Sequence, residues 1–230
     1  MTTDIMASHE PAATPSWRRS LLTVPAVAGV AYTAVWVAGL SVSSSSTSVR
    51  TSGPSVLAAY AGHQAAATTQ FVLTEGAAGV FLAVVVIAIG RAGLRAAGGR
   101  PARLTVGAGL AAAAISLLQC VLGVYLTTSV VSAGHAGTAG AVSDAISRLD
   151  GVKMLVLAVT AVAGVLLARR TAVLPCWLSA TGVALAAAIT ASGIGYLLLL
   201  DSLALAAWLS LPLLLVWVTG SGIALGRAGR

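Results

Sequence analysis

The chain has 230 residues, of which 58% are hydrophobic and only 8% are charged, and its mean hydropathy is +0.96. A soluble domain carries about 25% charged residues, so this composition excludes a soluble globular protein and indicates an integral membrane protein. The formal net charge of +7 does not indicate nucleic-acid binding, because the arginines occur singly or in pairs and form no basic helix with interleaved aromatic residues. The two cysteines are too few for a disulfide scaffold.

The chain begins with a polar segment, residues 1–17, which is rich in Pro, Ala and Thr and which we expect to be a disordered cytoplasmic tail. Residues 18–230 follow as one transmembrane domain. Six apolar stretches in it are long enough to cross a bilayer, for which about 20 residues are needed. They predict an all-α polytopic bundle of six transmembrane helices, with spans at about 21–42, 66–90, 104–127, 152–168, 175–200 and 203–225.

Two longer loops separate these spans on the side that we expect to face outward. In the first, Ser52-Gly-Pro54 predicts the start of a short helix lying along the membrane surface. The second, residues 128–151, is rich in Gly, Ala and Ser and is interpreted as the longest internal loop. Within it, the segment 141–149 repeats apolar residues at helical spacing and predicts a second short surface helix.

The basic residues are distributed unequally between the two sides of the membrane. Loops on the cytoplasmic side of membrane proteins carry an excess of Lys and Arg. With the N-terminus inside, ten basic residues fall on the cytoplasmic side and three on the other. An even number of spans also places both termini together. We therefore expect a multi-pass protein of the cell membrane with both termini in the cytoplasm. The three residues on the outer side are Arg50, Arg148 and Lys153.

One carboxylate, Glu75, lies clearly within an apolar span. A charged group at membrane depth costs about 2.5–3.5 kcal/mol on insertion scales, so its side chain should face the bundle interior, water or a partner. Counting about 1.5 Å per residue along antiparallel spans places Gln119 at a similar depth. Further polar groups occur near the same face, and together they form a candidate polar cluster: Glu75, Gln119, Asp150, Lys153, Tyr196 and Asp201.

Two interpretations of Glu75 remain open. In the functional one, it is a proton-binding or substrate-binding carboxylate in an outward-facing cavity. In the structural one, it hydrogen-bonds Gln119 or pairs with Lys153 and so joins the second, third and fourth spans. Asp150 and Lys153, three residues apart, could also form a local pair at the helix surface, worth only tenths of a kcal/mol.

No motif assigns a reaction or a cofactor. The chain lacks the zinc-protease sequence H-E-x-x-H and the phosphate-binding loop G-x-x-x-x-G-K-[ST]. His63, His135 and Asp144 all belong to the expected outer segments, but nothing fixes their spacing, so we predict no metal site and no cofactor. Gly222 and Gly226 form a G-x-x-x-G pair at the end of the last span, which indicates close helix contact.

Several segments together carry a resemblance. They include AGVAYTAVWVAGL in the first span, RAGLRAAGGRPARL between the second and third, SDAISRLDGVKMLVLA before the fourth and TAVLPCWLSATGVALA at the fifth. From about Arg18 onward the chain resembles uncharacterised six-span membrane proteins of high-GC bacteria that form a domain-of-unknown-function family. That resemblance implies the six-span fold and no reaction. Cys176 stands where an LPRWL-like sequence would have arginine.

Three functions fit the sequence. The first is a non-catalytic structural, binding or accessory membrane protein, whose partners are the lipid bilayer and a second copy or a neighbouring membrane protein. The second is a small proton-linked transporter or permease that uses Glu75. The third is a membrane enzyme that uses Glu75 or Asp201 as a general acid on a lipid or isoprenoid substrate. The absence of any catalytic motif favours the first.

Overall fold

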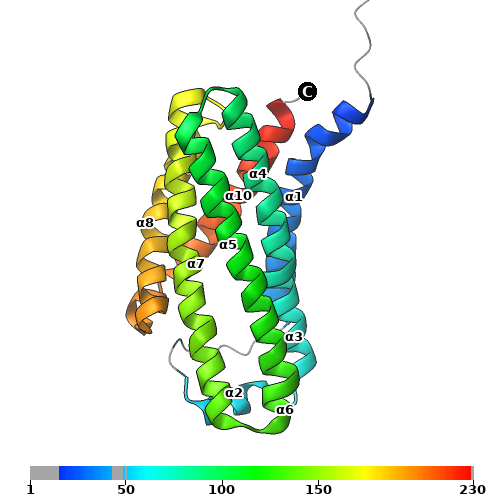
Figure 1. Ribbon diagram of the computed structural model, residues 1–230, viewed down its shortest axis with the longest axis vertical. Coiled ribbons are helices and arrows are strands. Elements are labelled where there is room, and N and C mark those ends of the chain that lie inside the picture. The colour runs from blue at the N-terminus through cyan, green and yellow to red at the C-terminus, as the bar shows by residue number, and fades with distance from the viewer. Residues whose placement is uncertain (1–15, 43–48, 50, 229–230) are drawn as a thin grey trace, which may run out of the picture.

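The structure is a computed structural model that describes residues 16–42, 49 and 51–228, and its described part is helical throughout, without a strand (Figure 1). Two short stretches, labelled η, are π-helical turns within longer helices. The elements in order are α1 Ser16–Val42, α2 Gly53–Tyr60, α3 Gln64–Phe71, η1 Val72–Ala77, α4 Ala78–Arg95, α5 Gly99–Tyr125, η2 Leu126–Val130, α6 Val131–Ala133, α7 Ala136–Thr171, α8 Cys176–Leu198, α9 Asp201–Ala204 and α10 Ala207–Ala228.

Six helical segments are long and apolar enough to cross a membrane, which confirms the predicted all-α bundle and an integral membrane protein. Consecutive elements without a break between them count as one segment, so α3, η1 and α4 form a single long helix. The six segments are Val24–Val42, Gln64–Arg95, Gly99–Ala133, Ala136–Thr171, Cys176–Leu198 and Asp201–Arg227.

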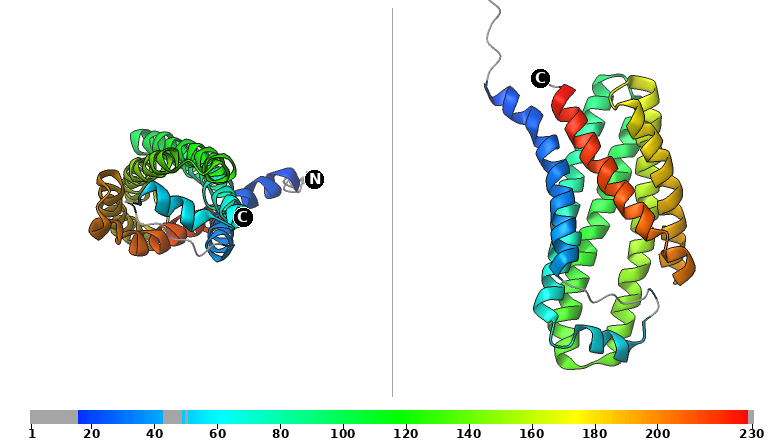
Figure 2. Two further views of the ribbon diagram at one scale, coloured as in Figure 1. Left: turned by 90° about the horizontal axis from the view of Figure 1, so that it is seen from below. Right: turned by 180° about the vertical axis from the view of Figure 1, so that it is seen from behind.

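The first and last helices bring both ends of the described chain to one end of the bundle. The start of α1 and the end of α10 lie at the same end in opposite views (Figure 1, Figure 2). We call this the terminal end and the opposite one the distal end. The loops between α4 and α5 and between α7 and α8 also lie at the terminal end, whereas α2 and α6 lie at the distal end.

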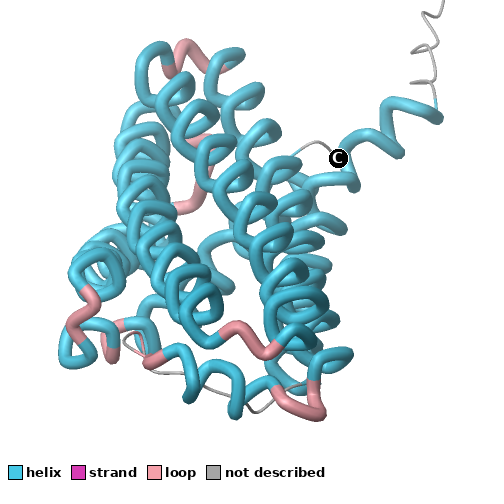
Figure 3. The backbone as a smooth tube through the Cα atoms, turned by 60° about the horizontal axis from the view of Figure 1, so that its bottom comes forward, coloured by secondary structure: helices cyan, strands magenta, loops and turns pink. Residues whose placement is uncertain are grey.

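Three of the six segments are longer than a bilayer requires. The segments Gln64–Arg95, Gly99–Ala133 and Ala136–Thr171 have 32, 35 and 36 residues, against the 20 or so that cross the hydrocarbon core. Their distal parts extend beyond α8 and α10, and α2 lies across them (Figure 2, Figure 3). We call these distal parts together with α2 the distal head.

The distal head has an apolar core of its own. It comprises Val56, Tyr60, Ala67, Leu126, Val130, Val131 and Ala139, contributed by α2 and all three long segments. A 2.7 Å hydrogen bond between the hydroxyls of Thr68 and Thr127 joins α3 to η2 within it. The head is therefore packed by the same apolar burial that holds a soluble helical domain together.

The interpretation of residues 128–151 as a long loop was wrong. The third segment stays helical to Ala133 and α7 begins at Ala136, so the connection is a tight turn in which Gly134 has the left-handed φ of +68°. The short helix expected at 52–60 exists as α2. The second short helix, expected at 141–149, is instead the distal part of the continuous α7.

Glycine allows α7 and α8 to approach closely. A Cβ added at Gly151 would lie 2.5 Å from the backbone nitrogen of Leu197 and 2.7 Å from the carbonyl oxygen of Gly193. In a lipid environment the hydrophobic effect does not drive helices together, so their association depends on van der Waals packing. Small residues at such crossings let the two backbones come close enough for that packing. Nearer the terminal end of the same pair of helices, the buried indole of Trp217 lies against Gly164 and Gly182.

We expect Gly151→Ala to destabilise the bundle, because the atoms that the new methyl would meet belong to the backbone of α8 and cannot rotate away. Overpacking of this kind costs about 1–3 kcal/mol. Thermal unfolding in detergent measures the effect. Gly107→Ala is the control, since a Cβ at Gly107 meets nothing within 4 Å; equal melting temperatures for the two variants would contradict this account of the crossing.

Candidate functional site

The centre of the site is Lys153, whose ammonium group lies between two carboxylates. Its Nζ is 2.8 Å from Oε2 of Glu75 and 2.7 Å from Oδ1 of Asp150. Asp150 precedes Lys153 by one turn of α7, whereas Glu75 comes from η1. The ion pair with Glu75 therefore joins two long helices. It is the pairing with Lys153 that the structural interpretation of Glu75 predicted.

Gln119 of α5 connects the third long helix to this group. Its Nε2 donates to the carbonyl oxygen of Ile146 at 3.1 Å and to Oδ1 of Asp150 at 3.3 Å. Its Oε1 is buried and has no hydrogen-bond partner among the described residues. Of the candidate polar cluster, the structure thus brings together four residues, which we call the polar network: Glu75, Gln119, Asp150 and Lys153.

The polar network is held in the interior of the bundle. Only 9% of Glu75, 6% of Lys153 and 1% of Gln119 is exposed. Charges removed from water to this extent are stable only when they are paired and hydrogen-bonded. Lys153 meets this condition because it pairs with both Glu75 and Asp150. Asp150 and Lys153 do pair, as the sequence suggested, but Lys153 is buried and also binds Glu75, so the pair belongs to the polar network and is not a local pair at the helix surface.

The local backbone brings Glu75 to this position. Glu75 lies in the π-helical turn η1, where the hydrogen bonds run from residue i to i+5 and one extra residue is accommodated. Close contacts flank it: a Cβ at Gly76 would lie 3.1 Å from the sulfur of Cys120, and one at Gly79 would lie 3.1 Å from Cβ of Ser116. These glycines let the Glu75 helix pack tightly on α5.

The polar network has one depth in all three helices. Glu75, Gln119 and Lys153 each lie sixteen residues from an arginine at the terminal end of their own helix, at Arg91, Arg103 and Arg169. At 1.5 Å per residue this separation is about 24 Å. If the arginines mark one edge of a hydrocarbon core about 30 Å thick, the network lies just inside the opposite edge, below the distal head.

The other two residues of the predicted cluster are placed differently. Tyr196 of α8 packs beside the small apolar group of Val49, Leu199 and Ala204, and it lies close enough to Asp150 and Lys153 to interact with them electrostatically. Asp201 is exposed at the first position of α9 and makes no ion pair with another described residue. Asp201 is thus outside the network.

Sequence reasoning missed Tyr32 of α1. It is only 3% exposed and lies close enough to Lys153 and Glu75 to interact with them electrostatically. The sequence signal for it was a tyrosine within an apolar span. The length of a span, however, does not show whether a side chain on it faces the bundle interior or the lipid. Because Tyr32 belongs to α1, this helix also faces the polar network, in addition to the three long segments that build it.

The comparisons with known proteins give no relative: no family model, no curated protein and no solved structure matches the chain. Among the residues that the structure describes, no three His, Cys, Asp or Glu side chains are grouped so as to hold a metal ion. Both cysteines are free.

We expect Lys153→Met to destabilise the protein more than Glu75→Gln does. The first change leaves two buried carboxylates without a cation, which costs about 3–5 kcal/mol. The second leaves Lys153 paired with Asp150 and removes one charge-assisted hydrogen bond, worth about 1.5–3 kcal/mol. Thermal unfolding of the two purified variants gives the order.

The matched control is Asp144→Asn, which removes a carboxylate from α7 outside the polar network and should leave the melting temperature almost unchanged. A Lys153→Met protein as stable as the wild type would show that the ion pairs do not hold the helices together.

Proposed function

We propose that the protein is a non-catalytic structural, binding or accessory membrane protein. One observation carries the proposal: the ammonium group of Lys153 is hydrogen-bonded to two carboxylates within 2.8 Å. Apart from Oε1 of Gln119, the network pairs its charged and polar groups within the protein. Its role is to fasten the three long helices at the level where they leave the membrane, so that the distal head is held rigidly above the surface.

The burial of the same residues argues against catalysis at this place. A general acid must come within hydrogen-bond reach of its substrate, and nine-tenths or more of Glu75, Gln119 and Lys153 is covered by protein. A cavity of about 810 Å³ does exist, but it lies at the terminal end and none of these residues lines it. Asp201 is exposed, and it makes no ion pair with another described residue.

We further propose that the protein is in the cell membrane with its terminal end in the cytoplasm and its distal head outside. The support is the distribution of charge. At or beside the terminal end are Arg18, Arg19, Arg91, Arg95, Arg100, Arg103, Arg169, Arg170 and Arg227, against Arg148 and Lys153 in the distal half.

Cys176 tests this orientation, because it is exposed and begins α8 at the terminal end. In a Cys120→Ser background, a membrane-impermeant maleimide should label Cys176 only after cells are permeabilised. Ala141→Cys, in a background without the native cysteines, is the control and should be labelled in intact cells, since Ala141 is exposed on the distal head. The opposite labelling pattern would reverse the proposed topology.

Proton-linked transport is the second candidate, and one observation favours it. Two carboxylates, Glu75 and Asp150, share a single ammonium group, so one carboxylate can take up a proton while the other keeps its ion pair with Lys153. Membrane-embedded carboxylates that exchange protons are typical of pumps and transporters. The burial of Glu75 weighs against this candidate.

Glu75→Gln separates the two candidates. For a structural network we expect the variant to unfold at lower temperature, and proteoliposomes of the wild-type protein to dissipate a proton gradient no faster than protein-free vesicles. A variant as stable as the wild type, together with proton flux that is present in the wild type and absent in the variant, would replace our proposal by the transporter. Asp144→Asn, with its carboxylate outside the network, should behave as the wild type in both measurements.

A further inference from the structure

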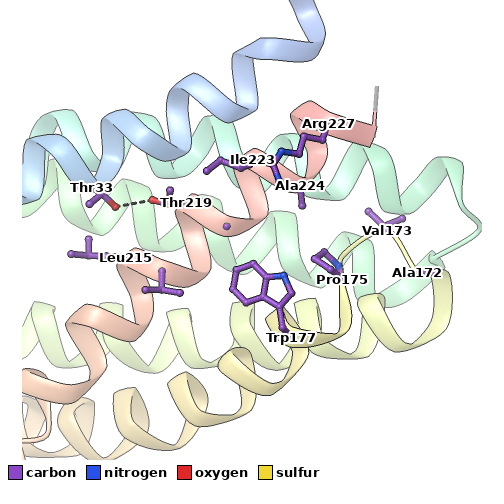
Figure 4. A pocket seen from close by; sticks show the side chains of 12 residues that line it. Thr33, Ala172, Val173, Pro175, Trp177, Leu215, Thr219, Ile223, Ala224 and Arg227 are labelled. Atoms are coloured by element: carbon purple, nitrogen blue, oxygen red, sulfur yellow. Dashed lines mark hydrogen bonds between the residues drawn. The ribbon is translucent and has the colours of Figure 1, made fainter. Parts of the chain in front are cut away.

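The cavity at the terminal end is a groove along α10. It runs from Arg227 at its rim to Leu215 at its deep end, and Thr33 of α1 and the connection between α7 and α8 complete its walls (Figure 4). Its volume of about 810 Å³ is that of a small-molecule site, for which about 300–1,000 Å³ is usual. The groove opens to the outside of the bundle, because Val216 and Trp177 in its lining are about half exposed.

The groove has a built apolar wall. The indole of Trp177 lies against the bare backbone of Gly220, where an added Cβ would come within 2.5 Å of the ring. On the other side, the hydroxyls of Thr33 and Thr219 are 2.7 Å apart, and Thr219 donates to the carbonyl oxygen of Gly29 (Figure 4). These hydroxyls satisfy each other and the backbone, so the interior of the groove offers apolar surface to an occupant.

The length of the groove matches one leaflet of a bilayer. Leu215 and Arg227 are twelve residues apart on α10, which is about 18 Å along the helix axis. Half of a hydrocarbon core of about 30 Å is about 15 Å. An acyl chain that enters beside Arg227 and follows the groove to Leu215 would therefore end near the midplane of the bilayer.

Arg227 gives the rim of the groove an uncompensated positive charge. The four acidic residues that the structure describes, Glu75, Asp144, Asp150 and Asp201, all lie in the distal half. Within residues 51–228, no hydrogen bond or ion pair occupies the exposed guanidinium of Arg227. Guanidinium groups bind phosphate through two parallel hydrogen bonds, and basic pockets between transmembrane helices bind anionic headgroups.

We propose that the groove binds an anionic phospholipid of the leaflet at the terminal end. The phosphate is held by Arg227, and one acyl chain lies along α10 between Trp177 and Leu215. This site lies outside the polar network and does not depend on the function proposed for it. It gives the protein a lipid specificity in addition to its position in the membrane.

Quenching of Trp177 fluorescence tests the proposal, because bromine atoms on an acyl chain quench an indole only in contact. The full-length protein is reconstituted into phosphatidylcholine vesicles that contain a minor fraction of brominated phosphatidylglycerol or of brominated phosphatidylcholine. The contribution of Trp177 is the difference between the wild type and Trp177→Phe. We expect the anionic lipid to be preferred at Trp177 by about fivefold, which is the usual effect of one basic residue near a membrane surface.

Two variants assign the preference to the groove. Arg227→Gln should abolish it, whereas Arg95→Gln, which removes an exposed arginine at the same end outside the groove, should retain it. Ala224→Leu fills the groove and should reduce quenching of Trp177 by either lipid. Equal quenching by the two lipids in the wild type, an unchanged preference in Arg227→Gln, or an equal loss in both arginine variants would overturn the proposal.

Discussion

The organisation of the bundle depends on the pairing of one buried ammonium group. Lys153 is a cation placed where water is excluded, and such a charge is stable only with its counter-charges in contact. Asp150 is supplied by the same helix, but Glu75 must come from another, and Gln119 from a third. The three long helices therefore have one relative rotation and one depth at which the charges meet. Glycine contacts at Gly76 and Gly79 permit the close approach of the Glu75 helix to α5.

Composition was sufficient to predict the six apolar helices and the all-α class, because a chain with 8% charged residues cannot cover a water-facing surface. The segment 128–151 could not be assigned in this way. Its Gly and Ser residues favour a loop in isolation, but propensity is a weak prior. Burial of Val130 and Ala139 against α2 stabilises the helices. Counting residues along each span placed Glu75 and Gln119 at a common depth. Which side chain Glu75 meets depends instead on how each helix is rotated about its axis. That rotation is determined by packing, so the pairing with Lys153 could not be chosen from the sequence.

The two ends of the molecule have different chemistry. The distal half contains every described acidic residue and the polar network, and the head above it is closed by α2. The terminal end is basic, contains the groove beside Arg227, and has no described carboxylate to neutralise its arginines. In the distal half, Lys153, Glu75 and Asp150 pair with one another. For Arg227 at the terminal end, lipid phosphate is the counter-charge that we propose.

The unequal lengths of the helices also relate the protein to the thickness of its bilayer. On α10, Trp208 is 82% exposed and Arg227 lies nineteen residues away, a separation of about 28 Å. Tryptophan and arginine anchor helices at the two interfaces, so this side is suited to a hydrocarbon core of about that thickness. The long helices cannot compensate by tilting independently, since the polar network joins them. A thicker membrane would have to thin around α8 and α10, and this mismatch would favour sorting of the protein into thinner membranes.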